Sequence, residues 1–106
     1  MKYPDDMDKE CVLICDAINN ISGLYTTESC CGHGRSEFNV HFNILNQKYL
    51  PVLLYYSHVG FEWTCEVYTD CAMSIPTYCL KSQSMGESAY SEANIIASKI
   101  EKYLLR

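Results

Sequence analysis

Hydrophobic residues repeat along this chain with two different periods, and these periods predict its helices and strands. Near the N-terminus, apolar residues three and four positions apart predict a helix over residues 5–22. Asp5 or Asp6 would cap this helix, and Gly23 would stop it. Its apolar stripe consists of Met7, Cys11, Ile14, Cys15, Ile18 and Ile21.

The same helical spacing returns at the C-terminal end and predicts a long helix over residues 87–105. Ser84 and Glu87 have the Ser-x-x-Glu spacing of a capping box at its start. A shorter helix is predicted over residues 50–57, with Pro51 in its first turn. The buried stripe of the long helix would be Ala89, Ala93, Ile96, Ala97, Ile100 and Leu104.

Strict alternation of apolar and polar residues predicts strands over residues 37–44 and 61–69. Shorter strands are predicted over residues 24–27 and 74–81, where Pro76 favours an edge position or a bulge. The last two strands are so close in sequence that we expect them to pair antiparallel. One face of each long strand is apolar: Phe38, Val40, Phe42 and Ile44 in the first, and Phe61, Trp63, Cys65 and Val67 in the second.

Together these elements predict a single α+β domain over residues 1–106. We expect about four mainly antiparallel strands, with the two long amphipathic helices packed on one face and a short third helix. A chain of 106 residues suffices for one hydrophobic core. Because a sheet this small leaves its edges uncovered, we also expect a homodimer.

The charge balance excludes some classes of partner. A net charge of −5 argues against binding duplex nucleic acid or an anionic membrane, since both need a basic face. The acidic N-terminus and the lack of a long apolar run predict a soluble cytoplasmic protein without a membrane segment. In that compartment the seven cysteines are expected to be reduced. Cys11 and Cys15 lie one helical turn apart, and we interpret them as core residues.

The densest chemistry lies in the loop between the first two predicted strands, residues 28–35. Glycines on both sides of His33 would free backbone amides to form an anion-binding nest, and His33 and Arg35 would add directed donors. We therefore predict a small binding domain that holds a phosphate- or nucleotide-type anion, with the loop facing the start of the last helix. The predicted ligand-binding residues are Ser29, Cys30, Cys31, Gly32, His33, Gly34, Arg35, Gly86, Tyr90 and Asn94. A tyrosine such as Tyr25, Tyr68 or Tyr90 would stack on a base.

Two alternatives for the same loop use its thiols. We expect no cofactor, but a zinc ion would use Cys31 and His33, with Cys30, His41 or Cys71 completing the site. A cysteine-dependent enzyme would use Cys30 or Cys31 as its nucleophile. Its base would be His33 with Glu28 as the orienting acid, or a remote histidine, His41 or His58.

Two further alternatives need no site chemistry. The loop would then be a structural turn in which Glu28 and Ser29 cap backbone amides. An interaction or inhibitor module would instead meet a basic protein partner with its acidic surface. The acidic groups available for this are Glu62, Glu66, Asp70 and the cluster at residues 5–10.

Residues 26–34, together with residues 86–94, resemble a group of short uncharacterised proteins of bacterial and phage genomes that carry a Glu-Ser-Cys-Cys-Gly-His-Gly signature. That resemblance implies a role in countering host defence, by sequestering a nucleotide signal or by blocking a protein partner. Ser29, Cys30 and Gly32 also resemble the Ser-Cys-Ser-Gly-Arg motif of the wybutosine-synthesising tRNA methyltransferase family, although Cys31 and His33 depart from it. This second resemblance implies methyl transfer from S-adenosylmethionine.

Overall fold

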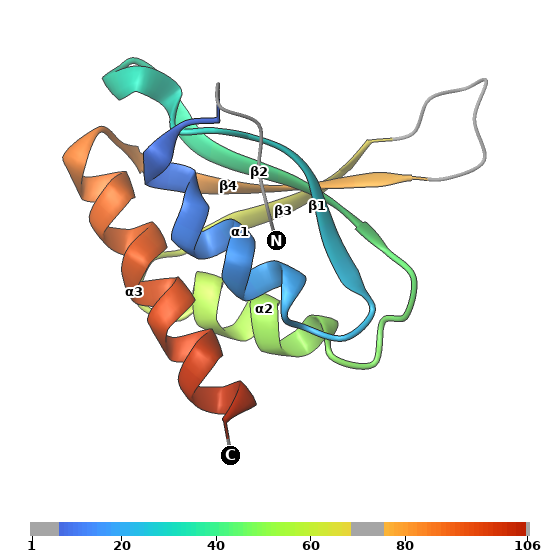
Figure 1. The fold of residues 1–106 in the computed structure, drawn as a ribbon. Coiled ribbons are helices and arrows are strands. Elements are labelled where there is room, and N and C mark those ends of the chain that lie inside the picture. Colours follow the sequence, from blue (N-terminus) through green and yellow to red (C-terminus); the bar gives the residue numbers. More distant parts are fainter. Residues whose placement is uncertain (1–6, 69–75, 106) are drawn as a thin grey trace.

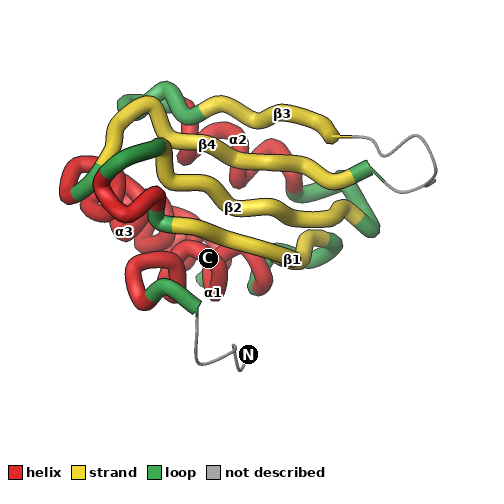
Figure 2. Tube along the Cα trace, turned by 90° about the horizontal axis from the view of Figure 1, so that it is seen from above, coloured by secondary structure: helices red, strands yellow, loops and turns green. Residues whose placement is uncertain are grey.

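The computed structural model describes residues 7–68 and 76–105, which form a layer of sheet packed against a layer of helices (Figure 1). Seen from above, all three α-helices lie on the same side of the sheet (Figure 2). The predicted α+β class is therefore confirmed, as is the order of its elements.

Four strands form one antiparallel sheet in the order β1-β2-β4-β3. They are β1 (Leu24–Cys30), β2 (Glu37–Ile44), β3 (Thr64–Tyr68) and β4 (Thr77–Met85). The predicted antiparallel pairing of the last two strands is confirmed. From the sequence, Pro76 favours an edge position or a bulge. The edge position is wrong, because β4 lies between β2 and β3, and the register shift of the β2–β4 pair lies at the other end of β4, between Lys81 and Met85. Pro76 precedes the strand, where it removes no donor from the ladder.

The first helical segment is shorter than predicted. It begins with a 3-10 turn, η1 (Lys9–Cys11), and continues as α1 (Val12–Asn19). Asp5 and Asp6, the predicted caps, lie outside the described residues. The helix ends at Asn19, before Gly23, and the Asn19 side chain bonds to β1: its Nδ2 donates to Thr26 Oγ1 at 2.9 Å, and its Oδ1 accepts from the Thr26 amide at 2.8 Å.

The remaining helices are α2 (Leu50–His58) and α3 (Glu87–Leu104). The predicted capping box of α3 is wrong, since Ser84 is still part of β4 and its hydroxyl donates to Glu92 Oε2 at 2.8 Å. Gly86 occupies the N-cap position instead, with φ 64°. The strand β4 runs beyond residue 81, the end predicted from the sequence, and β2 pairs with it as far as Met85.

The core lies between β2, β4 and the helices. Both predicted helical stripes are buried or pack against the core, as are the apolar residues of β2. Its largest fully buried side chains include Ile14, Ile18, Phe38, Phe42, Leu80, Ile96 and Ile100.

The strand predicted over residues 61–69 is only partly right. Glu62 has φ 58°, which breaks the extended backbone, so β3 starts at Thr64. Trp63 is buried just before the strand, where its Nε1 donates to Glu92 Oε1 at 2.8 Å. The alternation of Cys65 and Val67 with polar residues does not bury either side chain, because every residue of this edge strand is exposed.

Candidate functional site

The loop between β1 and β2 is a tight 3-10 turn, η2 (Gly32–Gly34), in which three successive residues have positive φ. The φ values are 82° at Gly32, 51° at His33 and 76° at Gly34. A Cβ atom at Gly32 would lie 2.9 Å from the Glu37 carbonyl oxygen. Only glycine fits there, whereas the left-handed conformation of His33 is strained.

The loop lies beside the start of α3, as the sequence predicted. A Cβ atom at Gly86 would be 3.8 Å from the Gly34 Cα atom. The Tyr90 hydroxyl lies 3.8 Å from the Cys31 sulfur and donates to it. The structure therefore brings Gly86 and Tyr90 to the loop, while Asn94 is an exposed residue one turn further along α3.

Most backbone amides of the loop already have acceptors within the chain. Arg35 is exposed and has no ion-pair partner among residues 7–68 and 76–105. An anion at this loop would therefore depend on that guanidinium more than on a nest of free amides. The amide bonds run from Cys31 to Asp8 Oδ2 (3.0 Å), from Gly32 to Cys30 Sγ (3.4 Å), from His33 to Cys31 Sγ (3.4 Å), and from Arg35 and Ser36 to the Gly32 carbonyl (2.9 and 3.1 Å).

Asp8, which the sequence analysis did not assign to the site, completes a cluster with Cys31 and His33. The Cys31 sulfur is 3.7 Å from His33 Nδ1, and His33 Nε2 is 3.8 Å from Asp8 Oδ2. One ligand atom from each residue can be chosen so that all three lie within 4.8 Å of one another. Carboxylate, thiol and imidazole therefore converge on one point at the protein surface.

Hydrogen bonding and burial set the protonation of this cluster. The amide of Cys31 lowers the pKa of the Asp8 carboxyl, so the group carries a charge at neutral pH. Burial raises the pKa of the Cys31 thiol, although the His33 amide and the Tyr90 hydroxyl oppose this by bonding to the sulfur. The same sulfur contact raises the pKa of Tyr90 to about 12.

The other predicted site residues have different surroundings. The hydroxyl of Ser29 bonds to the Cys11 and Cys15 thiols. Burial raises the pKa values of both thiols, and the bond from Ser29 offsets only part of this rise. Glu28 is exposed and is the strand partner of His41, so Asp8 occupies the position expected of an orienting acid beside His33.

The two remote histidines do not join the cluster. The ring of His41 lies 5.9 Å from that of Tyr68, on the face of β2 opposite the buried Val40 and Phe42. His58 is exposed at the end of α2. Cys71 lies outside the described residues.

Sequence reasoning missed Asp8 because it lies 23 positions from Cys31. In the sequence it belongs only to the acidic cluster at residues 5–10, a predicted surface for a basic protein partner. Asp8 is the N-cap residue of η1, but its side chain makes no capping bond there. The carboxylate instead accepts the Cys31 amide, and this contact brings it to the loop.

Within the described residues, no helix combines the length and the apolar character needed to span a membrane. Comparison of the chain with protein-family models, curated proteins and solved structures finds no match. The two resemblances stated from the sequence therefore stay predictions.

Proposed function

We propose that the protein is a small metal-binding domain in which Asp8, Cys31 and His33 hold a divalent ion of the zinc type. The observation that carries this proposal is the convergence of three different ligand atoms within 4.8 Å. Zinc bonds of about 2.0–2.3 Å in a tetrahedral site place ligand atoms about 3.3–3.8 Å apart. The 3.7 Å separation of Cys31 Sγ from His33 Nδ1 lies in that range. The 3.8 Å contact of His33 with Asp8 uses the other ring nitrogen, Nε2, and an imidazole binds one ion through one nitrogen. Metal binding would therefore draw the three ligand atoms, which lie within 4.8 Å of one another, slightly closer together.

Charge favours a cation over an anion at this point. The Asp8 carboxylate, with its lowered pKa, would repel a negative ligand beside it. A carboxylate and a thiolate balance the charge of a divalent ion, and a neutral imidazole is the commonest nitrogen ligand. Coordination displaces the Cys31 proton despite the raised pKa of the thiol, so metal affinity falls as the pH is lowered.

Three protein ligands leave a tetrahedral ion with an open position, as in catalytic zinc sites. The anionic ligand predicted from the sequence would bind there, with Arg35 as a second contact two residues beyond His33. The metal would thus supply the positive charge that the largely occupied amides of the loop do not.

Titration of the reduced protein with Co²⁺ tests this proposal, because a bound thiolate gives a charge-transfer absorption band. We expect Cys31→Ser to abolish the band, and Asp8→Asn or His33→Gln to weaken affinity by about tenfold or more. Cys30→Ser is the matched control, because the neighbouring thiol lies outside the cluster. Wild-type Co²⁺ affinity in Cys31→Ser would refute the site.

The same side chains favour thiol catalysis as a second candidate function. His33 stands between Cys31 and Asp8, the order of nucleophile, base and orienting acid in a cysteine triad. Burial of the thiol argues for the metal first, since a nucleophile must be reached by its substrate. Iodoacetamide labelling of the metal-free protein distinguishes the two functions. Catalysis predicts that Cys31 reacts faster than Cys65 near neutral pH, and that the reaction of Cys31 slows in His33→Gln.

A further inference from the structure

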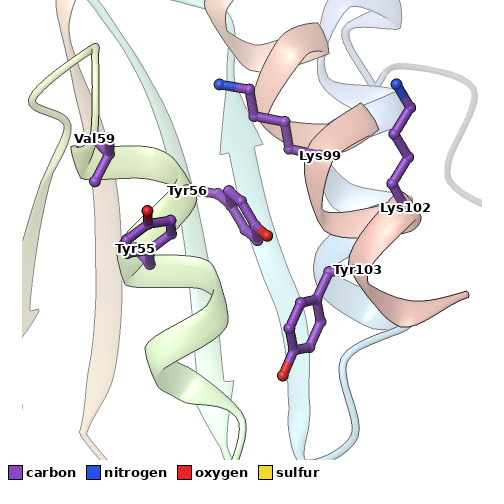
Figure 3. A pocket seen from close by; sticks show the side chains of 6 residues that line it. All are labelled: Tyr55, Tyr56, Val59, Lys99, Lys102 and Tyr103. Atoms are coloured by element: carbon purple, nitrogen blue, oxygen red, sulfur yellow. The ribbon is translucent and has the colours of Figure 1, made fainter. Parts of the chain in front are cut away.

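A second candidate site lies between α2 and α3, where a pocket of about 290 Å³ opens to solvent (Figure 3). Its walls come from the C-terminal halves of the two helices. Lys99 in this wall is nine residues beyond Tyr90, or about 14 Å along α3. The pocket is therefore separate from the proposed metal site, whose Cys31 contacts Tyr90 near the start of that helix. The lining residues are Tyr55, Tyr56, Val59, Lys99, Lys102 and Tyr103.

Three tyrosine rings line this pocket, Tyr55 and Tyr56 from α2 and Tyr103 from α3. The Tyr56 ring lies between the other two, with centroid distances of 5.1 Å to Tyr55 and 6.3 Å to Tyr103, both edge to face (Figure 3). Tyr55 is 59% exposed and Tyr103 36% exposed. Aromatic rings left open to solvent offer apolar faces on which a planar group can stack.

The α3 wall of the pocket also carries positive charge, in a chain whose net charge is −5. Lys99 and Lys102 both extend from α3, and their ammonium groups point away from the Tyr103 ring (Figure 3). Neither forms an ion pair with an acidic residue in the described part of the chain. The Lys99 ammonium instead lies 6.0 Å from the centroid of the Phe61 ring, so its charge stays available to a ligand.

From this combination we infer that the pocket binds a planar aromatic anion, such as a nucleoside monophosphate. The base would stack on the exposed ring of Tyr55, and the phosphate would accept hydrogen bonds from Lys99 and Lys102. This inference concerns different residues from the proposed metal site and does not depend on it.

A purely structural explanation exists for one of the two lysines. Lys102 lies in the last turn of α3, where a positive charge stabilises the helix dipole. That role predicts a loss of stability when the charge is removed, but no effect on ligand binding. The test must therefore measure binding and stability separately.

The experiment is an NMR titration of the isotopically labelled, metal-free protein with adenosine monophosphate, adenosine and inorganic phosphate. We expect the monophosphate to shift amide signals of residues 52–59 and 96–105, with adenosine and phosphate each binding at least about tenfold more weakly. The double variant Lys99→Gln, Lys102→Gln should bind the monophosphate about tenfold more weakly than wild type. Tyr55→Ala should bind the monophosphate no more tightly than wild type binds inorganic phosphate.

Lys48→Gln is the matched control, because Lys48 lies 5.3 Å from the Tyr49 ring centroid and is absent from the pocket lining. It should bind the monophosphate as wild type does. Unchanged binding in the double lysine variant, or no shifts up to millimolar monophosphate, overturns the inference. Shifts confined to residues 29–35 also overturn it and would instead support an anion at the loop.

Discussion

At the scale of single residues, the glycines of η2 differ in what surrounds them. Gly32 and Gly34 both have positive φ, 82° and 76°. A Cβ atom at Gly32 would meet the Glu37 carbonyl at 2.9 Å, whereas one at Gly34 would have no heavy atom within 4 Å. A side chain at Gly34 would therefore meet only backbone strain, whereas a side chain at Gly32 would meet both backbone strain and steric overlap.

We expect Gly32→Ala to destabilise the fold by about 2–4 kcal/mol, since strain and overlap add. Gly34→Ala should cost about 1 kcal/mol, because only the left-handed backbone opposes it. Urea denaturation of both variants measures the difference. Equal losses would contradict the close approach of Gly32 to Glu37.

Asp8 gives a pH dependence whose sign follows from its contacts. Because the Cys31 amide lowers its pKa below the ordinary value of 3.8, the ionised carboxylate stabilises the folded state above pH 3.8. This contribution is lost as the pH falls through the lower, folded-state pKa. An uncharged asparagine at this position would not titrate.

The free energy of unfolding of Asp8→Asn should therefore be lower than that of wild type at pH 7, and the difference should shrink below pH 3.8. Urea denaturation at pH 7 and pH 3 measures both values. Metal must be absent, since binding to the wild type alone would enlarge the difference at pH 7. A constant difference across this range would remove Asp8 as the titrating group.

At the scale of secondary-structure elements, one carboxylate joins three segments. Glu92 on α3 accepts the Trp63 indole N–H and the Ser84 hydroxyl, each at 2.8 Å. These bonds connect α3 to β4 and to the segment before β3. Trp63 is the single tryptophan of the chain and is only 2% exposed, so its N–H has little access to water.

Glu92→Ala should destabilise the protein by about 1–3 kcal/mol, because it leaves a buried donor without an acceptor. Glu101→Ala, an exposed change on the same helix, should stay within about 0.5 kcal/mol of wild type. Thermal unfolding followed by Trp63 fluorescence provides the measurement. Equal stability of the two variants would argue against the indole bond.

At the scale of the whole molecule, the packing of the helices on the sheet determines which thiols are exposed to solvent. Cys11, Cys15 and Cys79 are at most 1% exposed, whereas Cys65 is an exposed residue of the edge strand β3. Burial also raises the pKa of Cys11 to about 12, which keeps that thiol unreactive. The homodimer predicted from uncovered sheet edges stays a prediction, with β3 as one edge a partner would cover.

Alkylation of the native protein at pH 8, followed by peptide mapping, should label Cys65 first and Cys11, Cys15 and Cys79 last. The buried thiols react only when the fold opens, so their rates should rise to that of Cys65 in urea. Peptide mapping reports the labelling of Cys71 separately from that of the other thiols. Native labelling of Cys11 as fast as Cys65 would contradict the burial of η1 against the core.

The sequence alone determined those elements whose burial follows a local period. The stripes of α1 and α3 and the alternation of β2 were predicted residue by residue, because a helix or strand places nearby residues on one face whatever its partner. Tertiary structure decided the strand order, the exposure of β3, and the contacts of Asp8 and Glu92. Periodicity states which face of an element is buried, whereas these features depend on which distant segment covers it.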